Sequence, residues 1–474
     1  MFVVVLVNLP PVQTWLVSQV AESFSKKLNT KVSIKKIDIS FFNKLLLRDL
    51  LIEDQSKDTL VFAGTAKLSI TDWFIFKDKA EIKYLGLDDA VVKMNRTDSV
   101  WNYQFLIDYF DTPPTDKKKK QIEFNLKEAH FKNINFIKND AWIGQNMQVS
   151  LRALDLSMEG VDYKNKRITI NNLELDKPKF SQLDYTGKRP PQSDLSSILN
   201  KIPVVSAFKW NNSGWTISVG KLAVKDGRFL NDKETPQPAI ANHFDGLHID
   251  FSSINGSINN LLMQNDTLRG FVNLNAKERS GLIIKELSSN MRFTPDIMEF
   301  SNLVLATNKS RLTDYYSMSF KSFNKDMRKF ISDVTLKANF KNSYLHSDDL
   351  AFFAPPLKAW NREFKLQGDA QGTIENFSIK KMIVKTGGAY VDGDLAMRGL
   401  PNIKSTFIDF TSRSLRSSYA ELSHIIPQLK KITSPDIKSL GSINFAGNFT
   451  GFLDDFVTFG TLRSNLGVIK ADLN

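Results

Sequence analysis

The stretch from Val32 to Asp54 alternates apolar and polar residues almost strictly, and this period of two constrains the fold more than any other feature of the chain. A β-strand with one buried face and one wetted face places an apolar residue at every second position. Most of the chain beyond Lys31 repeats the pattern. We therefore expect a mainly β protein whose one-sided strands need an apolar cover.

Length and charge narrow the functional classes. The chain has 474 residues, more than a single hydrophobic core usually serves, so several domains or one repetitive architecture are expected. Lys and Arg number 63 against 51 Asp and Glu, and the formal net charge of +12 favours either an anionic partner or plain solubility. No nucleic-acid-binding motif accompanies this charge, so no nucleic acid partner is expected. Because cysteine is absent, disulfides and thiolate metal sites are excluded.

Residues 1–10 are expected to be the remnant of a membrane anchor. About eight apolar residues stand where a spanning helix needs about 20, and neither a basic segment before them nor a small-residue cleavage site after them indicates a signal peptide. A hydrophobic first strand or core segment is the alternative, and Pro10 and Pro11 end either one. The candidate anchor residues are Phe2, Val3, Val4, Val5, Leu6 and Val7.

Residues 11–29 predict an amphipathic helix. Apolar residues recur there with helical spacing, Lys26 and Lys27 occupy the last turn, and Asn29 is the expected C-cap. This helix could lie on a bilayer or pack over the first strands. Shorter helices are expected at residues 101–110, 194–202, 348–360 and 413–432, and polar, basic loops at 111–121 and 184–194.

A weak repeat of the form apolar-x-apolar-x-x-small-x-apolar runs through the strands. We interpret the small residue or proline as the site of a turn or bulge across which the alternation changes parity. Similar spacing between copies indicates repeated supersecondary units. The copies begin at Leu85, Phe124, Leu173 and Leu222 and, less regularly, at Leu247 and Met382.

Three architectures can cover one-sided strands. A β-sandwich covers each sheet with another, and a closed barrel covers its face with its own far wall. Either one would normally finish within a couple of hundred residues and leave linkers that the sequence lacks. We therefore predict a long, curved, antiparallel, repeating β-groove that is continuous over residues 30–474, is U-shaped like a folded taco, and has apolar material inside.

A specific resemblance lies near the start of the chain. The segment from Asn8 to Ile70 resembles the N-terminal segment of the TamB family of translocation and assembly module subunits, in the AsmA-like superfamily. In that family an anchor ending at Pro-Pro precedes a helix and strands of the type T-x-V-x-I-x-x-I-x-I-x-F-F and L-x-D-x-L-I-x-D, matched here from Thr30 and from Leu47. The segment from Gly447 to Asn474 also resembles an interior piece of the family.

The resemblance implies an inner-membrane-anchored protein that spans the periplasm of a Gram-negative bacterium and carries phospholipid toward the outer membrane along a lipid-filled β-groove. Its implied partners are phospholipid acyl chains, the inner membrane and an outer-membrane TamA-like barrel protein, the last through a C-terminal region missing from this chain. The alternative function is a periplasmic scaffold that assists outer-membrane protein assembly. A surface binding module made of β-sandwiches is a third interpretation. Family members are far longer, which indicates an N-terminal fragment.

The sequence favours a non-enzymatic role without a cofactor. His243 and His248 lie five residues apart and lack the spacing and acidic neighbours of a metal site. The glycine-rich segment Gly387 to Asp394 lacks the form of a phosphate-binding loop and predicts a hairpin turn. No catalytic serine or zinc-protease motif occurs.

The apolar residues of the repeat are the candidate lining of the lipid path. The alternative is a dry protein core, which the alternation cannot distinguish from a lipid-filled groove. The candidate lining residues are Leu85, Leu87, Phe124, Leu126, Leu173, Leu175, Leu222 and Val224.

Overall fold

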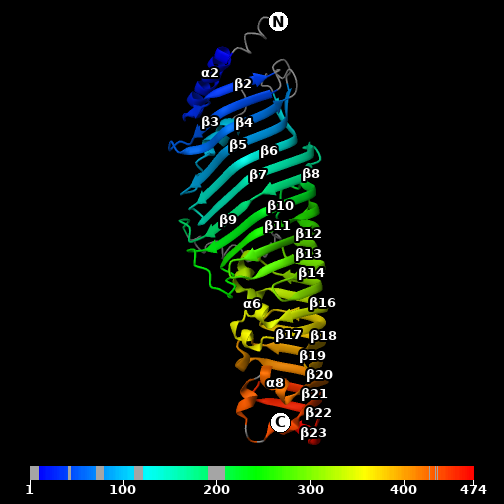
Figure 1. Cartoon of the computed structure of the whole chain (residues 1–474). Helices are drawn as coiled ribbons and strands as arrows, with labels where there is room; N and C mark the ends of the chain where they lie inside the picture. The colour runs from blue at the N-terminus through cyan, green and yellow to red at the C-terminus, as the bar shows by residue number, and fades with distance from the viewer. Residues whose placement is uncertain are drawn as a thin grey trace, which may run out of the picture. The chain divides into compact units, whose positions relative to one another are not determined.

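The structure is a computed structural model that describes residues 10–40, 44–70, 79–111, 121–190, 209–425, 427–432, 434 and 436–473. It is mainly β, with 62% of residues in strands and 13% in helices, which confirms the predicted fold class at this level (Figure 1). The chain divides into two units, which are described separately.

The first unit contains residues 1–239, 245–265 and 276–279. Its strands are long because few helix-forming segments interrupt the alternating pattern. They are β1 (Val32–Ser33), β2 (Lys36–Ser40), β3 (Lys44–Glu53), β4 (Thr59–Ile70), β5 (Lys79–Arg96), β6 (Gln121–Asp140), β7 (Gln145–Asp162), β8 (Arg167–Asp176), β9 (Lys179–Asp184), β10 (Thr216–Lys233) and β11 (His248–Gln264).

Strand pairing in the first unit is mixed, so the prediction of a wholly antiparallel sheet is wrong. Strand β5 is parallel to β6, and β10 is parallel to both β8 and β9. Parallel neighbours require a crossover, and residues 97–120 and 185–215 provide the two crossovers. Strands β8 and β9 occupy the same position in the sheet, one after the other between β7 and β10, since β7 and β10 each pair with both of them.

The second unit contains residues 240–244, 266–275 and 280–474. From β13 onward each strand pairs antiparallel with the next, as predicted. The strands are β12 (Thr267–Glu278), whose last residues belong to the first unit, β13 (Ile283–Thr294), β14 (Ile297–Ala306), β15 (Arg311–Ser319), β16 (Thr335–His346), β17 (Glu363–Gly372), β18 (Asn376–Thr386), β19 (Ala389–Arg398), β20 (Phe407–Ser418), β21 (Ser442–Gly451), β22 (Phe456–Ser464) and β23 (Gly467–Leu473).

Two α-helices in the first unit match the helices predicted over residues 11–29 and 101–110. Helix α2 (Pro10–Leu28) ends where Asn29 adopts the left-handed conformation, with φ 49°, as expected of its C-cap. Helix α3 (Gln104–Asp111) lies beside α2, and the Tyr109 ring meets the Phe24 ring edge-on. None of the helices among the described residues is long and apolar enough to span a membrane.

Helical segments of the second unit are short. They are α5 (Phe323–Asp326), η2 (Met327–Lys329), α6 (Phe330–Asp333), α7 (Ser347–Leu350), η3 (Pro355–Trp360), η4 (Ile403–Ser405), α8 (Tyr419–Ile425), η5 (Pro427–Lys431) and η6 (Ile437–Leu440).

The predicted helix over 413–432 is wrong in its first part. Residues up to Ser418 belong to β20, where Arg416 pairs with Tyr390 on one side and Asn444 on the other, so sheet pairing overrides the helical spacing. The predicted helix over 348–360 is two short pieces, α7 and η3. The hairpin predicted at Gly387 is confirmed, and the helix predicted over 194–202 lies outside the described residues.

Candidate functional site

A row of left-handed residues crosses the strands of the first unit. The strand register passes over Asp49, Gly64, Asp89 and Asn133, which occupy matching positions between directly paired neighbours. Asp49, Asp89 and Asn133 have φ of 50°, 55° and 53°, and Asp and Asn tolerate this region better than most residues. We call this line the kink row, and it continues through Lys177 and Asp226, with φ of 49° and 52°.

The kink row reverses the parity of the alternation. A Cβ atom on Gly227 would lie 2.8 Å from Val224 Cγ1 and 3.4 Å from Ile254 Cβ, so positions 224, 227 and 254 face the same side. In an uninterrupted strand, residues three apart face opposite sides. The left-handed Asp226 produces this change, and the small residue beside it leaves room for the neighbouring side chains. The predicted role of the small residue in the repeat is confirmed in β10.

Four rows of mostly apolar residues run across the strands on this face, two on each side of the kink row. Directly paired residues in a sheet point to the same side. Row 1 contains Leu45, Leu68, Leu85, Ala129, Leu156, Leu173, Leu222 and Ile258. Row 2 contains Ile37, Leu47, Ala66, Leu87, Phe131, Leu154, Leu175 and Val224.

Rows 3 and 4 lie beyond the kink row. Row 3 contains Leu50, Ala63, Ala90, Ile134 and Leu151 and, further along, Gly227 and Ile254. Row 4 contains Ile52, Val61, Val92, Phe136, Val149, Phe180, Phe229 and Phe251. The rings of Phe180 and Phe229 stack with their centroids 5.5 Å apart.

The large side chains of rows 1 to 4 are only partly buried. The fully buried residues of these rows are small ones, such as Ala63 and Ala129, which are 2% and 1% exposed. The leucines and most phenylalanines are half-buried, and Phe229 is 37% exposed. In a sandwich core the large residues would be the buried ones. Neighbours within the face therefore cover these side chains only partly.

The opposite face of the same strands carries many paired polar residues, besides a short apolar row of Leu51, Phe62 and Val91. Lys67 Nζ lies 2.7 Å from Asp88 Oδ2, and His130 Nδ1 lies 2.5 Å from an oxygen of Asp155. Arg228 binds Asp250 through two hydrogen bonds, which raise the pKa of the Arg228 guanidinium. Cross-strand pairs of this kind stabilise a solvated sheet face. The first unit therefore has one apolar face and one face that carries most of the charged pairs.

The structure brings together six of the eight candidate lining residues. Leu85, Leu173 and Leu222 lie in row 1. Leu87, Leu175 and Val224 lie in row 2. Whether lipid covers these side chains stays a prediction.

The second copy of the repeat, which begins at Phe124, is offset from the first in the strand register. Leu126 lies where the register of β5 and β6 shifts between Ile82 and Tyr84, and Ala129 lies opposite Leu85 instead of Ala90. Phe124 is in β6, but its side chain is outside the described residues. The candidate anchor residues from Phe2 to Val7 are also outside them.

The spacing 2-3-2 between row residues would have found copies of the repeat that the sequence analysis missed. It occurs in β3 at positions 45, 47, 50 and 52 and in β7 at positions 149, 151, 154 and 156. The repeat required a small residue at the third position, and β7 has Leu154 there. Requiring only the spacing would have included these strands.

The second unit has the same organisation. Left-handed residues at strand irregularities include Asn302, Asn342 and Lys381, with φ of 52°, 49° and 52°. Burial raises the pKa of the Tyr316 hydroxyl to about 12, and Tyr316 belongs to a row of mostly apolar residues. The row contains Met291, Phe300, Tyr316, Ala338, Ala370, Ile379, Leu395, Phe410 and Phe449.

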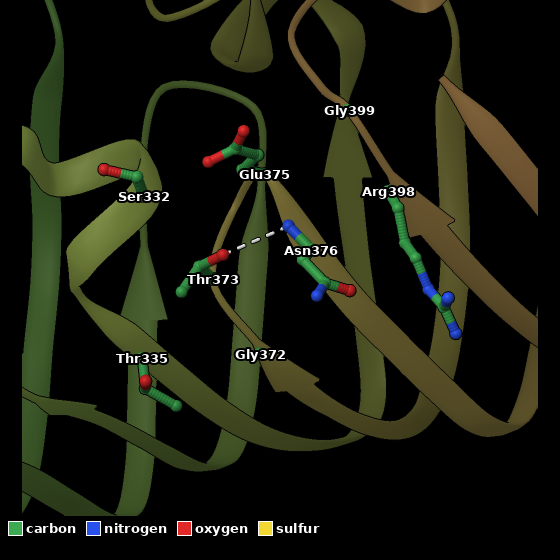
Figure 2. Close-up of a pocket in the computed structure, with 8 residues that line it drawn as sticks. All are labelled: Ser332, Thr335, Gly372, Thr373, Glu375, Asn376, Arg398 and Gly399. Carbon is green, nitrogen blue, oxygen red and sulfur yellow. Dashed lines mark hydrogen bonds between the residues drawn. The ribbon is translucent and has the colours of Figure 1, made fainter. Parts of the chain in front are cut away.

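A polar cavity of about 450 Å³ lies at the strand ends of the second unit (Figure 2). Thr373 Oγ1 accepts a hydrogen bond of 3.0 Å from the Asn376 backbone, and Glu375 and Arg398 supply opposite charges to the lining. The remaining lining residues are Ser332, Thr335, Gly372 and Gly399. This lining contains no histidine, cysteine or lysine, and we assign it no reaction.

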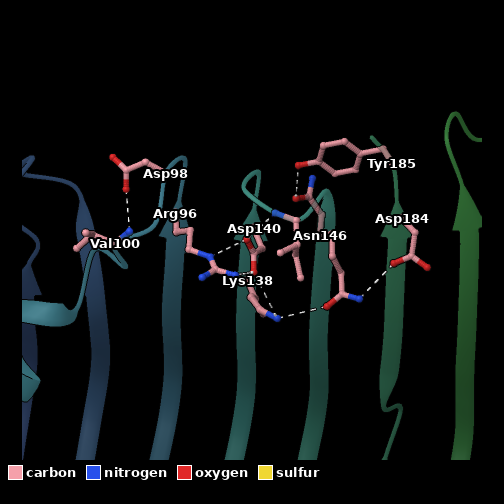
Figure 3. A network of polar contacts seen from close by, with 10 residues as sticks. Arg96, Asp98, Val100, Lys138, Asp140, Asn146, Asp184 and Tyr185 are labelled. Carbon is pink, nitrogen blue, oxygen red and sulfur yellow. Dashed lines mark hydrogen bonds and ion pairs between the residues drawn. The ribbon is translucent and has the colours of Figure 1, made fainter. Parts of the chain in front are cut away.

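A buried ion pair joins the parallel strands β5 and β6 at their carboxyl ends (Figure 3). Arg96 donates to both carboxylate oxygens of Asp140, at 2.8 and 2.7 Å, and Asp140 is fully buried. Burial alone would raise the pKa of the Asp140 carboxyl, but the hydrogen bonds from Arg96 and the Ile143 backbone outweigh it and lower the pKa. The ion pair links the last residues of the two strands, and we assign it a structural role.

One of the two histidines considered for a metal site, His248, is buried and lies 3.2 Å from Asp232 Oδ1. Another histidine, His346, accepts a hydrogen bond from the Asp348 backbone. Within the described ranges, no group of three or more His, Asp or Glu side chains is placed to hold a metal ion.

Comparisons with known proteins assign no family to this arrangement. No protein family model matches the chain, and no curated protein matches it either.

Proposed function

We propose that the chain binds phospholipid acyl chains along the face made by rows 1 to 4 and serves as a non-enzymatic lipid-transfer conduit between membranes. The observation that carries the proposal is the set of half-buried Leu and Phe side chains in register across consecutive strands. Apolar surface of this extent is rare on monomeric proteins and marks a binding site for something apolar.

The polarity of the two faces supports lipid as the ligand. Acyl chains need a continuous apolar surface and no directional partner, which rows 1 to 4 supply. In our proposal the sheet bends at the kink row so that the apolar rows line a groove, with the ion-paired face turned to water. Bends at sheet irregularities are a known route to curvature.

The resemblance of Asn8 to Ile70 to the TamB family supports the same function. It suggests an inner-membrane anchor, a periplasmic location and a TamA-like barrel partner at the outer membrane. These belong to the proposal together with the conduit. A scaffold for outer-membrane protein assembly would instead use the backbone edges of strands to pair with client strands.

Aspartate placed in the apolar face should lower the amount of bound lipid. Val224→Asp puts a carboxylate in row 2, whereas Ala223→Asp puts one on the opposite face, where Ala223 pairs with Glu174 and Ser257. A charge held in hydrocarbon costs about 3 kcal/mol, which is on the order of a hundredfold in local occupancy. Native mass spectrometry of detergent-free protein measures the copurified phospholipid.

The proposal expects phospholipid in the wild type and the Ala223→Asp control, and a clear loss in Val224→Asp with circular dichroism unchanged. A soluble wild type that is consistently empty would contradict it. Unfolding of Val224→Asp but not of the control would favour a packed protein core. Capture of client polypeptide by crosslinkers on strand edges, with no lipid on the apolar face, would favour the assembly scaffold.

A further inference from the structure

Two loops at one end of the first unit form a compact aromatic and basic tip. The turn between β7 and β8 supplies residues 162–167, and the segment before β10 supplies residues 209–216. We call this pair of loops the β8 tip. The Tyr163 and Trp215 rings meet edge-on with their centroids 6.0 Å apart.

Hydrogen bonds hold the two loops of the β8 tip together. Lys166 Nζ donates to the Ser213 carbonyl at 2.9 Å, and the Thr216 backbone donates to the Lys166 carbonyl at 2.8 Å. Within the second loop, Asn211 is buried, and its side chain bonds the backbone of Trp215 in both directions. These hydrogen bonds fix the conformation of the tip and so position its exposed side chains.

Those exposed side chains are large aromatics and cations. Tyr163 is 56% exposed and Trp210 is 42% exposed. Four exposed basic residues surround them, namely Lys164, Lys166, Arg167 and Lys209. The aspartate of the tip, Asp162, is engaged by Asn165, whose backbone and side-chain hydrogen bonds lower the pKa of the carboxyl.

We infer that the β8 tip is a docking site for an anionic lipid surface. Exposed Trp and Tyr are the side chains that settle at the level of lipid head groups, since one end of the ring system is apolar and the other is polar. Clustered Lys and Arg are attracted to the negative potential of anionic lipids. An acidic polypeptide would use the charges but gives no reason for the exposed aromatics. A single-stranded nucleic acid would stack its bases on the rings, but the sequence carries no nucleic-acid-binding motif, so lipid is the favoured partner.

This inference is independent of acyl-chain transport. It concerns the surface on which the protein docks, whereas the proposed function concerns the apolar rows on the sheet face. Val224→Asp should therefore leave docking unchanged, and a defect in the tip should leave the copurified lipid unchanged.

Vesicle cosedimentation of the full chain tests the inference. The wild type is expected to bind vesicles of phosphatidylcholine with phosphatidylglycerol several-fold more tightly than vesicles of phosphatidylcholine alone, with weaker binding as salt is raised. The tip variant Lys209→Glu/Trp210→Ser should lose roughly tenfold or more in affinity, because it reverses one charge and removes one aromatic anchor.

The second unit offers a matched control. Ile403→Ser/Lys404→Glu changes an adjacent exposed apolar and basic pair by the same charge, and Ile403 is 44% exposed. The control should bind like the wild type. Equal loss in both variants, equal binding to both vesicle types, or preference for a soluble acidic polypeptide or an oligonucleotide over the anionic vesicles would overturn the inference.

Discussion

At the residue scale, the Asp140 carboxylate shows how long-range pairing determines local chemistry. Its partner Arg96 lies 44 positions away, and the two meet because β5 and β6 are parallel in one particular register. Sequence pattern could identify both strands, but an isolated Arg and an isolated Asp gave no sign of their contact. Polar pairs closed by strand register are therefore beyond single-sequence prediction, whereas one-residue features such as the Asn29 C-cap are within it.

Removing the Asp140 charge should destabilise the first unit in a pH-dependent way. Asp140→Asn leaves Arg96 without its carboxylate, at a cost of about 3 kcal/mol near neutral pH. Because the folded-state pKa of Asp140 is lowered, its contribution is fully present above the unfolded-state pKa of about 3.9 and disappears as pH falls through the folded-state pKa. Urea unfolding of both proteins from pH 7 downward measures the difference.

The neighbouring Asp98 provides the control, since it is exposed and its carboxylate accepts a hydrogen bond from the Val100 backbone (Figure 3). Asp98→Asn should cost no more than about 0.5 kcal/mol at any pH. A difference for Asp140→Asn that stays constant down to the lowest pH would show that the charge is not the cause.

At the element scale, the kink row explains both the success and the failure of the repeat. Alternation predicts a strand, and a three-residue step predicts a parity change, but the step does not say which residue is left-handed. Asp89 and Asn133 are typical of that conformation, whereas Lys177 is not. The direction of pairing was also missed, because the short helix and the polar loop expected in each crossover did not indicate how the flanking strands pair.

The parity change predicts a coupling between Gly227 and Val224. Gly227→Ala places a methyl group 2.8 Å from Val224 Cγ1, and overpacking of this kind costs about 1 to 3 kcal/mol. In the Val224→Ala background that atom is gone, so the same substitution should cost about 1 kcal/mol less. Urea unfolding followed by hydrogen exchange of the β10 amides measures all four proteins of the cycle. Equal costs in the two backgrounds would mean that positions 224 and 227 face opposite sides.

At the scale of the whole molecule, the exposed surface is large for the mass of the chain. The accessible area is 29,025 Å², whereas a compact monomer of 53.8 kDa is expected to expose about 18,000 Å². Among the described residues the helices are few, as the sequence already indicated, and the large side chains of rows 1 to 4 on the apolar face stay partly exposed. What covers that face could not be deduced from the alternation, because a strand that faces lipid and one that faces protein carry the same residues.

Since both units carry apolar rows, their contributions to lipid binding should add. Val224→Asp alters the first unit, and Leu395→Asp alters the second in the row that contains Phe410. The control Ala223→Asp/Ala396→Asp places the same two charges on the opposite faces, where Ala396 pairs with Ser378 and Asp409. Native mass spectrometry should show less phospholipid in each single variant and a loss in the double variant close to the sum. If one substitution accounts for the entire loss, lipid occupies a single local site and the extended apolar face has another purpose.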